Sequence, residues 1–160
     1  AALELQAALT HAVHGADVVV MAAAVADFRP SSYADHKIKK SHEAAADGSA
    51  DESAPVVTLV RNPDILAGLV EARGSATTPV IVGFAAETGD EHTSVLEHGR
   101  AKALRKGADL LVVNEVGAEL GFGQPTNDVT ILAKDGEICG AAAGTKREIA
   151  DAILDAVLEL

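Results

Sequence analysis

One acidic residue and a nearby group of lysines suggest a ligand. Asp27 follows a strongly apolar run, Val18 to Val25. Three lysines come ten to thirteen residues later, at Lys37, Lys39 and Lys40. A carboxylate can hold a divalent metal ion, and lysines can offset phosphate charge. A buried strand that ends in Asp27, followed by a flexible cationic loop, would therefore suit a nucleotide triphosphate and its metal ion.

A second group of basic residues lies at Arg100, Lys102, Arg105 and Lys106. The two groups hold seven of the 13 Lys and Arg, although the formal net charge is −11. On an acidic protein, local cationic patches favour a small polyanionic ligand, although both could be solvated surface charge. We expect no nucleic-acid partner, because the chain is acidic and has one Tyr, three Phe and no Trp to stack bases.

Length and composition predict one domain in the cytoplasm. The 160 residues are 48% hydrophobic, which suits a single core. The only cysteine, Cys139, excludes an internal disulfide, and we expect it to be packed in a strand rather than reactive. No apolar stretch reaches the roughly 18 residues of a membrane span, and no signal peptide opens the chain, so no membrane partner is expected.

Three apolar runs predict strands, at 16–24, 79–85 and 108–113, and the first is expected to be a central strand. Polar residues follow these runs, at Asp27, Glu87 and Asn114. Helical patterns separate the runs. This alternation predicts an α/β fold, a Rossmann-like and mainly parallel sheet covered by helices. Function is expected where the carboxyl ends of the strands meet.

Local signals predict the remaining elements. Asn62 is expected to cap a helix that Pro63 and Asp64 begin, and capping alone would explain all three residues. Asp135-Gly136 predicts an antiparallel hairpin between 128–134 and 137–143. Further helices are expected at 2–14, 90–106 and 145–160. The last begins with a Thr145/Glu148 capping box and has one apolar stripe, formed by Ile149, Ile153, Val157 and Leu160.

Two polar segments predict irregular structure. Residues 41–55 are rich in Ala, Ser, Gly and acids and predict a flexible insertion. Residues 117–127 predict a loop.

Seven motifs, taken in order, resemble those of phosphopantothenate-cysteine ligases. They are MAAAVADFRP, the Lys37 to Lys40 run, RNPDIL, VIVGFAAET, AKALRKGADLLVVNEV, the glycine-containing loop that ends at Asn127, and TKREIADAIL. The resemblance runs from about Ala16 to Leu160. In bacteria such domains are usually the carboxyl-terminal half of a bifunctional coenzyme A biosynthesis protein. FMN would belong only to the other half, a flavin-dependent decarboxylase.

The resemblance implies a reaction in two steps. CTP, with Mg²⁺ or another divalent cation, activates the carboxylate of 4'-phosphopantothenate as an acyl-cytidylate and releases pyrophosphate. The amine of L-cysteine then forms the amide and releases CMP. Such chemistry needs charge neutralisation more than a covalent nucleophile.

The resemblance also assigns residues. Lys37 is implied to act in acyl transfer and to contact the nucleotide phosphates, and Asp27 to contact nucleotide and metal ion. Other implied CTP contacts are Asn62, Pro63, Asp64, Ile65, Phe84, Lys102 and Lys106. Lys39 and Lys40 supply supporting charge. The roles of Glu87, Asn114 and Asn127 stay open.

The chain departs from the family pattern at its start. Family members begin with a strand, a glycine-containing phosphate loop and an asparagine that holds the acyl intermediate, and none of these precedes Ala1. We therefore expect one domain, 1–160, that lacks these parts and binds CTP. The family further implies a homodimer with the active site near the interface, and a flap from Asp27 to Lys40.

Two other functions remain open. An NAD(P)-dependent oxidoreductase would carry a G-x-G-x-x-G turn; Gly121 and Gly123 begin one, but position 126 is Thr and no helix is predicted to follow. A non-catalytic nucleotide-binding module would keep the CTP contacts and form no product. The residues alone do not decide between CTP and ATP.

Overall fold

The computed structural model describes residues 1–38, 55–88, 93–116 and 125–160. Lys39 and Lys40, nearly all of the predicted insertion 41–55, the start of the predicted helix 90–106 and most of the predicted loop 117–127 therefore lie outside the described residues. So do Gly121 and Gly123. The elements in chain order are α1 (Ala2–Ala12), β1 (Val18–Met21), β2 (Phe28–Pro30), β3 (Leu59–Arg61), α2 (Ile65–Arg73), β4 (Val80–Glu87), α3 (Val95–Lys106), β5 (Leu110–Glu115), β6 (Thr126–Ala133), β7 (Ile138–Thr145) and α4 (Lys146–Leu158).

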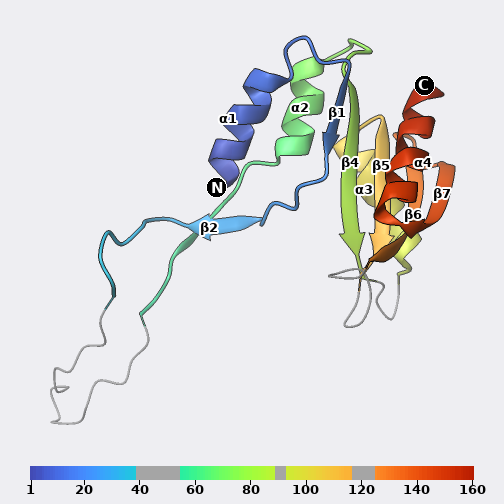
Figure 1. Cartoon of the computed structure of the whole chain (residues 1–160). Helices are drawn as coiled ribbons and strands as arrows, with labels where there is room; N and C mark the ends of the chain where they lie inside the picture. The colour runs from blue at the N-terminus through green and yellow to red at the C-terminus, as the bar shows by residue number, and fades with distance from the viewer. Residues whose placement is uncertain (39–54, 89–92, 117–124) are drawn as a thin grey trace, which may run out of the picture.

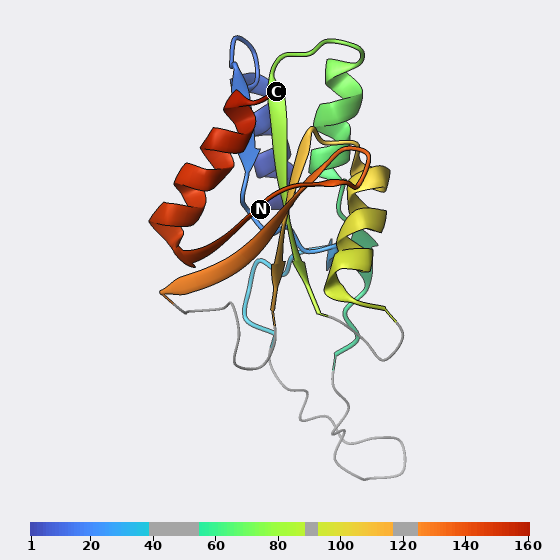
Figure 2. The same cartoon turned by 90° about the vertical axis from the view of Figure 1, so that its right-hand side faces the viewer.

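A five-stranded sheet forms the centre of the fold, in the order β1-β4-β5-β6-β7. β1, β4 and β5 are parallel, whereas β6 and β7 are antiparallel to their neighbours. The α/β fold class and the hairpin around Asp135-Gly136 are thus confirmed. Helices α1, α2 and α3 cover one face of the sheet, and α4 covers the other (Figures 1 and 2).

The alternation of side chains along β4 explains why there are two cores. Ile81 and Ala85 point toward α1 to α3 and belong to one buried cluster. Val82 belongs to the second, which Ile149 and Ile153 of α4 complete. Because parallel strands need cover on both faces, the helices fix where the strand ends open to solvent.

The prediction of a central position for the first strand was wrong. β1 lies at one edge of the sheet in the described part of the chain. Val19 is buried under the helices, but Val18 and Val20 on the other face are 37% and 45% exposed. The apolar run is therefore covered on one face only.

A short two-stranded ribbon was not predicted. β2 and β3 pair antiparallel and form a separate sheet. Figure 1 shows β2 standing away from the five-stranded sheet. The ribbon joins residues about 30 apart in sequence, so local periodicity gives no sign of it. It begins directly after Asp27 and ends directly before Asn62.

Two smaller predictions about the carboxyl-terminal third were wrong. Cys139 is exposed, because β7 is an edge strand, and its thiol donates to the carbonyl of Ile131 at 3.4 Å. Leu160 is 67% exposed, because α4 ends at Leu158 and the apolar stripe ends with it. The Thr145/Glu148 capping box is confirmed: the amide of Glu148 donates to the Thr145 hydroxyl at 3.3 Å.

Close packing of α3 on β5 generates a stability prediction. A Cβ atom on Gly99 would lie 2.8 Å from Cγ2 of Val113, whereas nothing lies within 4 Å of a Cβ on Gly68 of α2. Gly68→Ala should raise the free energy of unfolding by up to about 1 kcal/mol through helix propensity. Gly99→Ala should lower it, because the buried Val113 has to move. Urea denaturation of both variants tests this, and equal gains at the two sites would contradict it.

Candidate functional site

A polar hollow of about 340 Å³ opens at the carboxyl ends of β1 and β4. Its walls come from the connection after β1, the segment between β3 and α2, the end of β4, and α3. Eight of the nine predicted nucleotide contacts line it, namely Asp27, Asn62, Pro63, Asp64, Ile65, Phe84, Lys102 and Lys106. Segments up to about 80 residues apart in sequence thus share one cavity.

Lys37, the ninth predicted contact, does not line the hollow. It is exposed and belongs to the segment that leaves β2, which runs away from the five-stranded sheet (Figure 1). Asp27 does line the hollow, but it does not end a strand as predicted. β1 ends at Met21, and an irregular stretch of small residues carries the chain to Asp27. The carboxylate is therefore held by a connection rather than by the sheet.

The start of α2 differs from the prediction. Asp64, not Asn62, is the N-cap, and its carboxylate accepts a hydrogen bond from the amide of Ala67 at 3.1 Å. The side-chain amide of Asn62 donates instead to the carbonyl of Ala26 at 2.7 Å. The sequence offers two good capping residues on either side of Pro63, and tertiary contacts decide between them. Both residues still line the hollow.

Each lysine of the hollow has a carboxylate partner. Lys106 pairs with Asp64, which links the last turn of α3 to the first turn of α2. Lys102 pairs with Glu87, the last residue of β4. Glu87 and Lys102 side chains are only 16% and 28% exposed, so solvent screens this pair incompletely. The lysine heads are thus held in place before any ligand arrives.

The partnership of Glu87 with Lys102 was missed by sequence reasoning. The sequence marks Glu87 as a strand end and Lys102 as part of a helical cationic face, with nothing to connect them. The available signal was topological. A helix that follows a parallel strand packs back over it, so α3 and β4 are neighbours and an acid on one can pair with a lysine on the other.

Asn114 and Asn127, whose roles the sequence leaves open, are not among the residues that line the hollow. Asn114 sits within β5, opposite Val129, and is not among the lining residues. Asn127 lies on β6, where its side-chain oxygen accepts from the amide of Asp128 at 3.0 Å. The three predicted strand ends therefore contribute unequally to this site.

The carboxylate of Asp64 has a lowered pKa. Partial burial raises the pKa, but hydrogen bonds from Lys106 and the Ala67 amide, together with the charges of Lys106 and Arg105, outweigh burial. Asp64 is therefore charged at neutral pH and matches the positive end of the α2 dipole.

The hollow offers little to a metal ion by itself. Within the described ranges, no group of three or more His, Cys, Asp and Glu side chains is arranged to hold one. Asp64 is already engaged, which leaves Asp27 as the lining carboxylate without a cationic partner among the described residues. A Mg²⁺ ion bound to substrate phosphates commonly needs only one or two protein carboxylates. The donor set therefore fits a metal ion that arrives with a polyphosphate.

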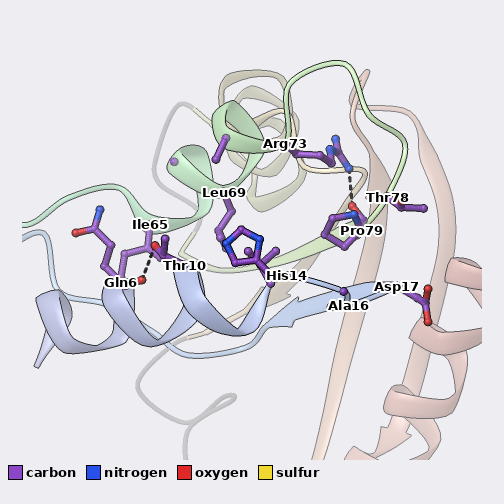
Figure 3. A pocket seen from close by; sticks show the side chains of 14 residues that line it. Gln6, Thr10, His14, Ala16, Asp17, Ile65, Leu69, Arg73, Thr78 and Pro79 are labelled. Carbon is purple, nitrogen blue, oxygen red and sulfur yellow. Dashed lines mark hydrogen bonds between the residues drawn. The ribbon is translucent and has the colours of Figure 1, made fainter.

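A second cavity, of about 540 Å³, lies between α1 and α2 (Figure 3). Of the predicted contacts, only Ile65 lines it. Its most buried charged group, Arg73, already pairs with Asp109 and donates to the carbonyl of Pro79 at 3.0 Å. Asp109 in turn accepts from the amide of Ile81 at 2.8 Å. This network joins α2 to the amino-terminal end of β4, so we assign it to stability.

None of the helices in the described residues is long and apolar enough to cross a membrane.

Fold and hollow together define a class: an α/β domain with a lysine-containing site at the carboxyl ends of parallel strands. Comparison of sequences is more specific. The chain belongs to the family described as DNA/pantothenate metabolism flavoprotein C-terminal domain, which matches residues 1–160.

Three curated relatives share the name Coenzyme A biosynthesis bifunctional protein CoaBC. The protein of Mycobacterium tuberculosis (strain CDC 1551) is 49% identical over 146 residues, 89% of this chain and 33% of the relative. That of Mycolicibacterium smegmatis is 46% identical over 159 residues, 98% of this chain and 36% of the relative. That of Escherichia coli (strain K12) is 37% identical over 137 residues, 85% and 30% respectively. The chain thus spans about a third of the length of these relatives.

Solved structures agree on the fold. The DNA/pantothenate metabolism flavoprotein from Streptococcus pneumoniae superposes with a TM-score of 0.65 at 18% identity, covering 97% of this chain and 68% of that one. The Cab2 mutant H337A, in complex with phosphopantothenate-cysteine, gives 0.51 at 24% identity, covering 85% and 42%. At these identities the likeness speaks for the fold alone.

The lowered pKa of Asp64 predicts a pH-dependent contribution to stability. Because folding lowers the pKa, the charged carboxylate stabilises the fold above its unfolded-state pKa of about 3.9. That contribution fades as the pH falls through the lower folded-state value. Asp64→Asn keeps a capping oxygen and removes the charge. The variant should therefore be less stable at neutral pH and equal to the parent in strong acid, as measured by urea denaturation across pH; a constant difference would contradict this.

Proposed function

We propose that the chain is the CTP-binding part of a phosphopantothenate-cysteine ligase that acts in coenzyme A biosynthesis. The observation that carries the proposal is the gathering of Asp27, the 62–65 segment and two lysines around one hollow. The names of the curated relatives favour the pathway, and the ligand of the Cab2 complex is the product of such a ligation.

The reaction joins two substrates at the expense of CTP. A carboxylate oxygen of 4'-phosphopantothenate attacks the α-phosphorus of CTP, and the bond to pyrophosphate breaks, which leaves an acyl-cytidylate. The amine of L-cysteine then attacks the acyl carbon, loses a proton, and CMP leaves as the amide forms. Negative charge builds up on phosphate oxygens in the first step. Lys102 and Lys106 would stabilise that charge from fixed positions.

In this proposal, nucleotide binding requires the negative charge of the triphosphate to be balanced in the hollow. The lining groups Asp27, Asp64, Lys102 and Lys106 carry no net charge as a set, whereas CTP carries about four negative charges near neutral pH. Mg²⁺ or another divalent cation, held by Asp27 and the phosphates, would supply the missing positive charge and polarise the phosphoryl group. Glu87 and Asp64 would keep the lysines oriented while the phosphates share them.

Lys37 is proposed to act in acyl transfer. The described residues from Asp27 to Ile38 include one arginine, Arg29, and one lysine, Lys37. Arg29 already donates hydrogen bonds to Arg61 and Asn62, which leaves Lys37 for the nucleotide. Since Lys37 lies outside the hollow, the role requires its segment to close over the bound nucleotide.

A homodimer is part of the proposal. Phe28 on β2 and Leu59 on β3 are 51% and 54% exposed, on a ribbon that stands away from the sheet. A second copy would cover such a surface. Sedimentation of the chain measures its mass directly, and a monomer at micromolar concentration would count against the dimer.

Two alternatives make different binding predictions. A dinucleotide-dependent oxidoreductase would bind NADH or NADPH, and a non-catalytic module would bind CTP without releasing pyrophosphate. The preference for CTP over ATP follows the resemblance to the bacterial ligases.

Calorimetric titration tests the nucleotide proposal. The chain should bind CTP with Mg²⁺ and should leave NADH and NADPH unbound. Lys102→Gln should weaken CTP binding by about tenfold or more, because a charge-assisted phosphate contact is lost. Lys134→Gln, at an exposed position in the β6–β7 turn, is the matched control and should bind as the parent does. Binding of NADPH with no binding of CTP would reverse the proposal.

A second test addresses Lys37 in a full-length bifunctional protein that carries this chain. Lys37→Ala should lower CTP affinity only modestly, since the hollow itself is intact. Pyrophosphate release in the presence of 4'-phosphopantothenate should fall by about 100-fold or more, as expected for a group that acts mainly in the transition state. Unchanged turnover would remove Lys37 from the reaction, and a parent protein that releases no pyrophosphate would favour the non-catalytic module.

A further inference from the structure

Two chain segments meet at the mouth of the hollow, and one arginine lies at their junction. One segment leads from Ala26 and Asp27 into β2, and the other leads from β3 through Asn62 into α2. The Nη1 group of Arg29 donates to the carbonyl of Arg61 at 2.6 Å and to the side-chain oxygen of Asn62 at 3.1 Å. The segments are therefore joined through the side chain of Arg29.

Asn62 completes the junction from the opposite side. Its side-chain nitrogen donates to the carbonyl of Ala26 at 2.7 Å, and its main-chain amide donates to the carbonyl of Asp27 at 2.8 Å. These two bonds fix the stretch that carries the Asp27 carboxylate. The connection after β1 has no strand or helix of its own between Ala22 and Asp27, so Asn62 supplies the order that secondary structure does not.

Arg29 determines which way the amide of Asn62 points. A guanidinium can only donate, so it requires the oxygen of the amide on its side. A turned amide would place its NH₂ group against the guanidinium and its oxygen against the Ala26 carbonyl. Both contacts would be repulsive. Arg29 thus selects the one orientation in which Asn62 can hold Ala26.

Arg29 itself is not among the residues that line the hollow, whereas Asp27 and Asn62 are. It is half-buried. Arg29 contacts the lining residue Asn62 directly and Asp27 only by way of Asn62, so it is placed to act through them.

We infer that Arg29 is a positioning residue for the nucleotide site: by orienting the Asn62 amide, it holds the Asp27 carboxylate and the start of α2 at the spacing that a metal-bound triphosphate requires. This inference rests on the proposed function and adds a residue to it. Ordering these groups before binding lowers the entropic cost of capturing the ligand. Loss of Arg29 therefore weakens nucleotide binding without removing any contact to the nucleotide.

The test compares arginine variants by calorimetric titration with CTP and Mg²⁺. Arg29→Gln should weaken binding by about tenfold, since two hydrogen bonds from a charged donor are lost. Arg29→Lys, which can reach one acceptor but not both, should recover part of the affinity. Arg147→Gln is the matched control: Arg147 also donates to a side chain, Asp151, but on the solvent-exposed face of α4, and its loss should leave the affinity unchanged.

A double-mutant cycle separates positioning from general destabilisation. If Arg29 acts through Asn62, Arg29→Gln should cost little further affinity once Asn62→Ala is present. Thermal unfolding of each variant shows whether it is folded at the titration temperature. If Arg29→Gln is unfolded at that temperature, Arg29→Lys replaces it in the cycle. Full additivity, or a folded Arg29 variant with parental affinity, would overturn the inference. A parent chain that binds no CTP would instead overturn the proposed function.

Discussion

Parallel pairing of β1, β4 and β5 is the constraint on which the rest of the structure depends. Parallel strands share a direction, so their carboxyl ends meet at one edge of the sheet, and each crossover returns over a face. Side chains from distant segments therefore converge without any local signal that brings them together. The hollow lies where one connection leaves this edge from β1 toward the ribbon and another segment returns from β3 into α2.

Ion pairs hold the two lysine side chains of the hollow in place. Lys102 and Lys106 point toward carboxylates that come from two other elements. Such pairs change the free energy of folding little when they are partly exposed, and they restrict the rotamers of the long lysine side chains. A polyphosphate that enters meets cations whose conformational entropy has already been lost. The arrangement favours ligands that bring positive charge with them over bare anions.

Sequence reasoning succeeded where a few adjacent residues decide the structure. Asp135-Gly136 and the Thr145/Glu148 box are complete within four residues, and both formed as predicted. The long apolar runs gave the strands and hence the fold class. The resemblance to phosphopantothenate-cysteine ligases also pointed to eight residues that share one cavity, although their chemical roles remain proposals.

The failures have a common physical cause, which is dependence on partners remote in sequence. Asn62 looked like a helix cap, but Ala26 and Arg29 engage it. Val18 and Val20 looked doubly covered, but no helix of the described chain lies over that face of β1. The β2–β3 ribbon pairs segments on either side of residues 39–54, and the apolar run VVTLV at 56–60 does not by itself identify its partner. Composition cannot report such contacts.

Asp64 is a side chain that serves the fold and the hollow at once. The same carboxylate begins α2, joins α3 and borders the hollow. Selection for a folded chain and selection for ligand binding then act on the same residue. Either kind of selection would suppress substitution at this position. The segment from Asn62 to Ile65 should therefore persist even in descendants that keep the fold and lose the activity.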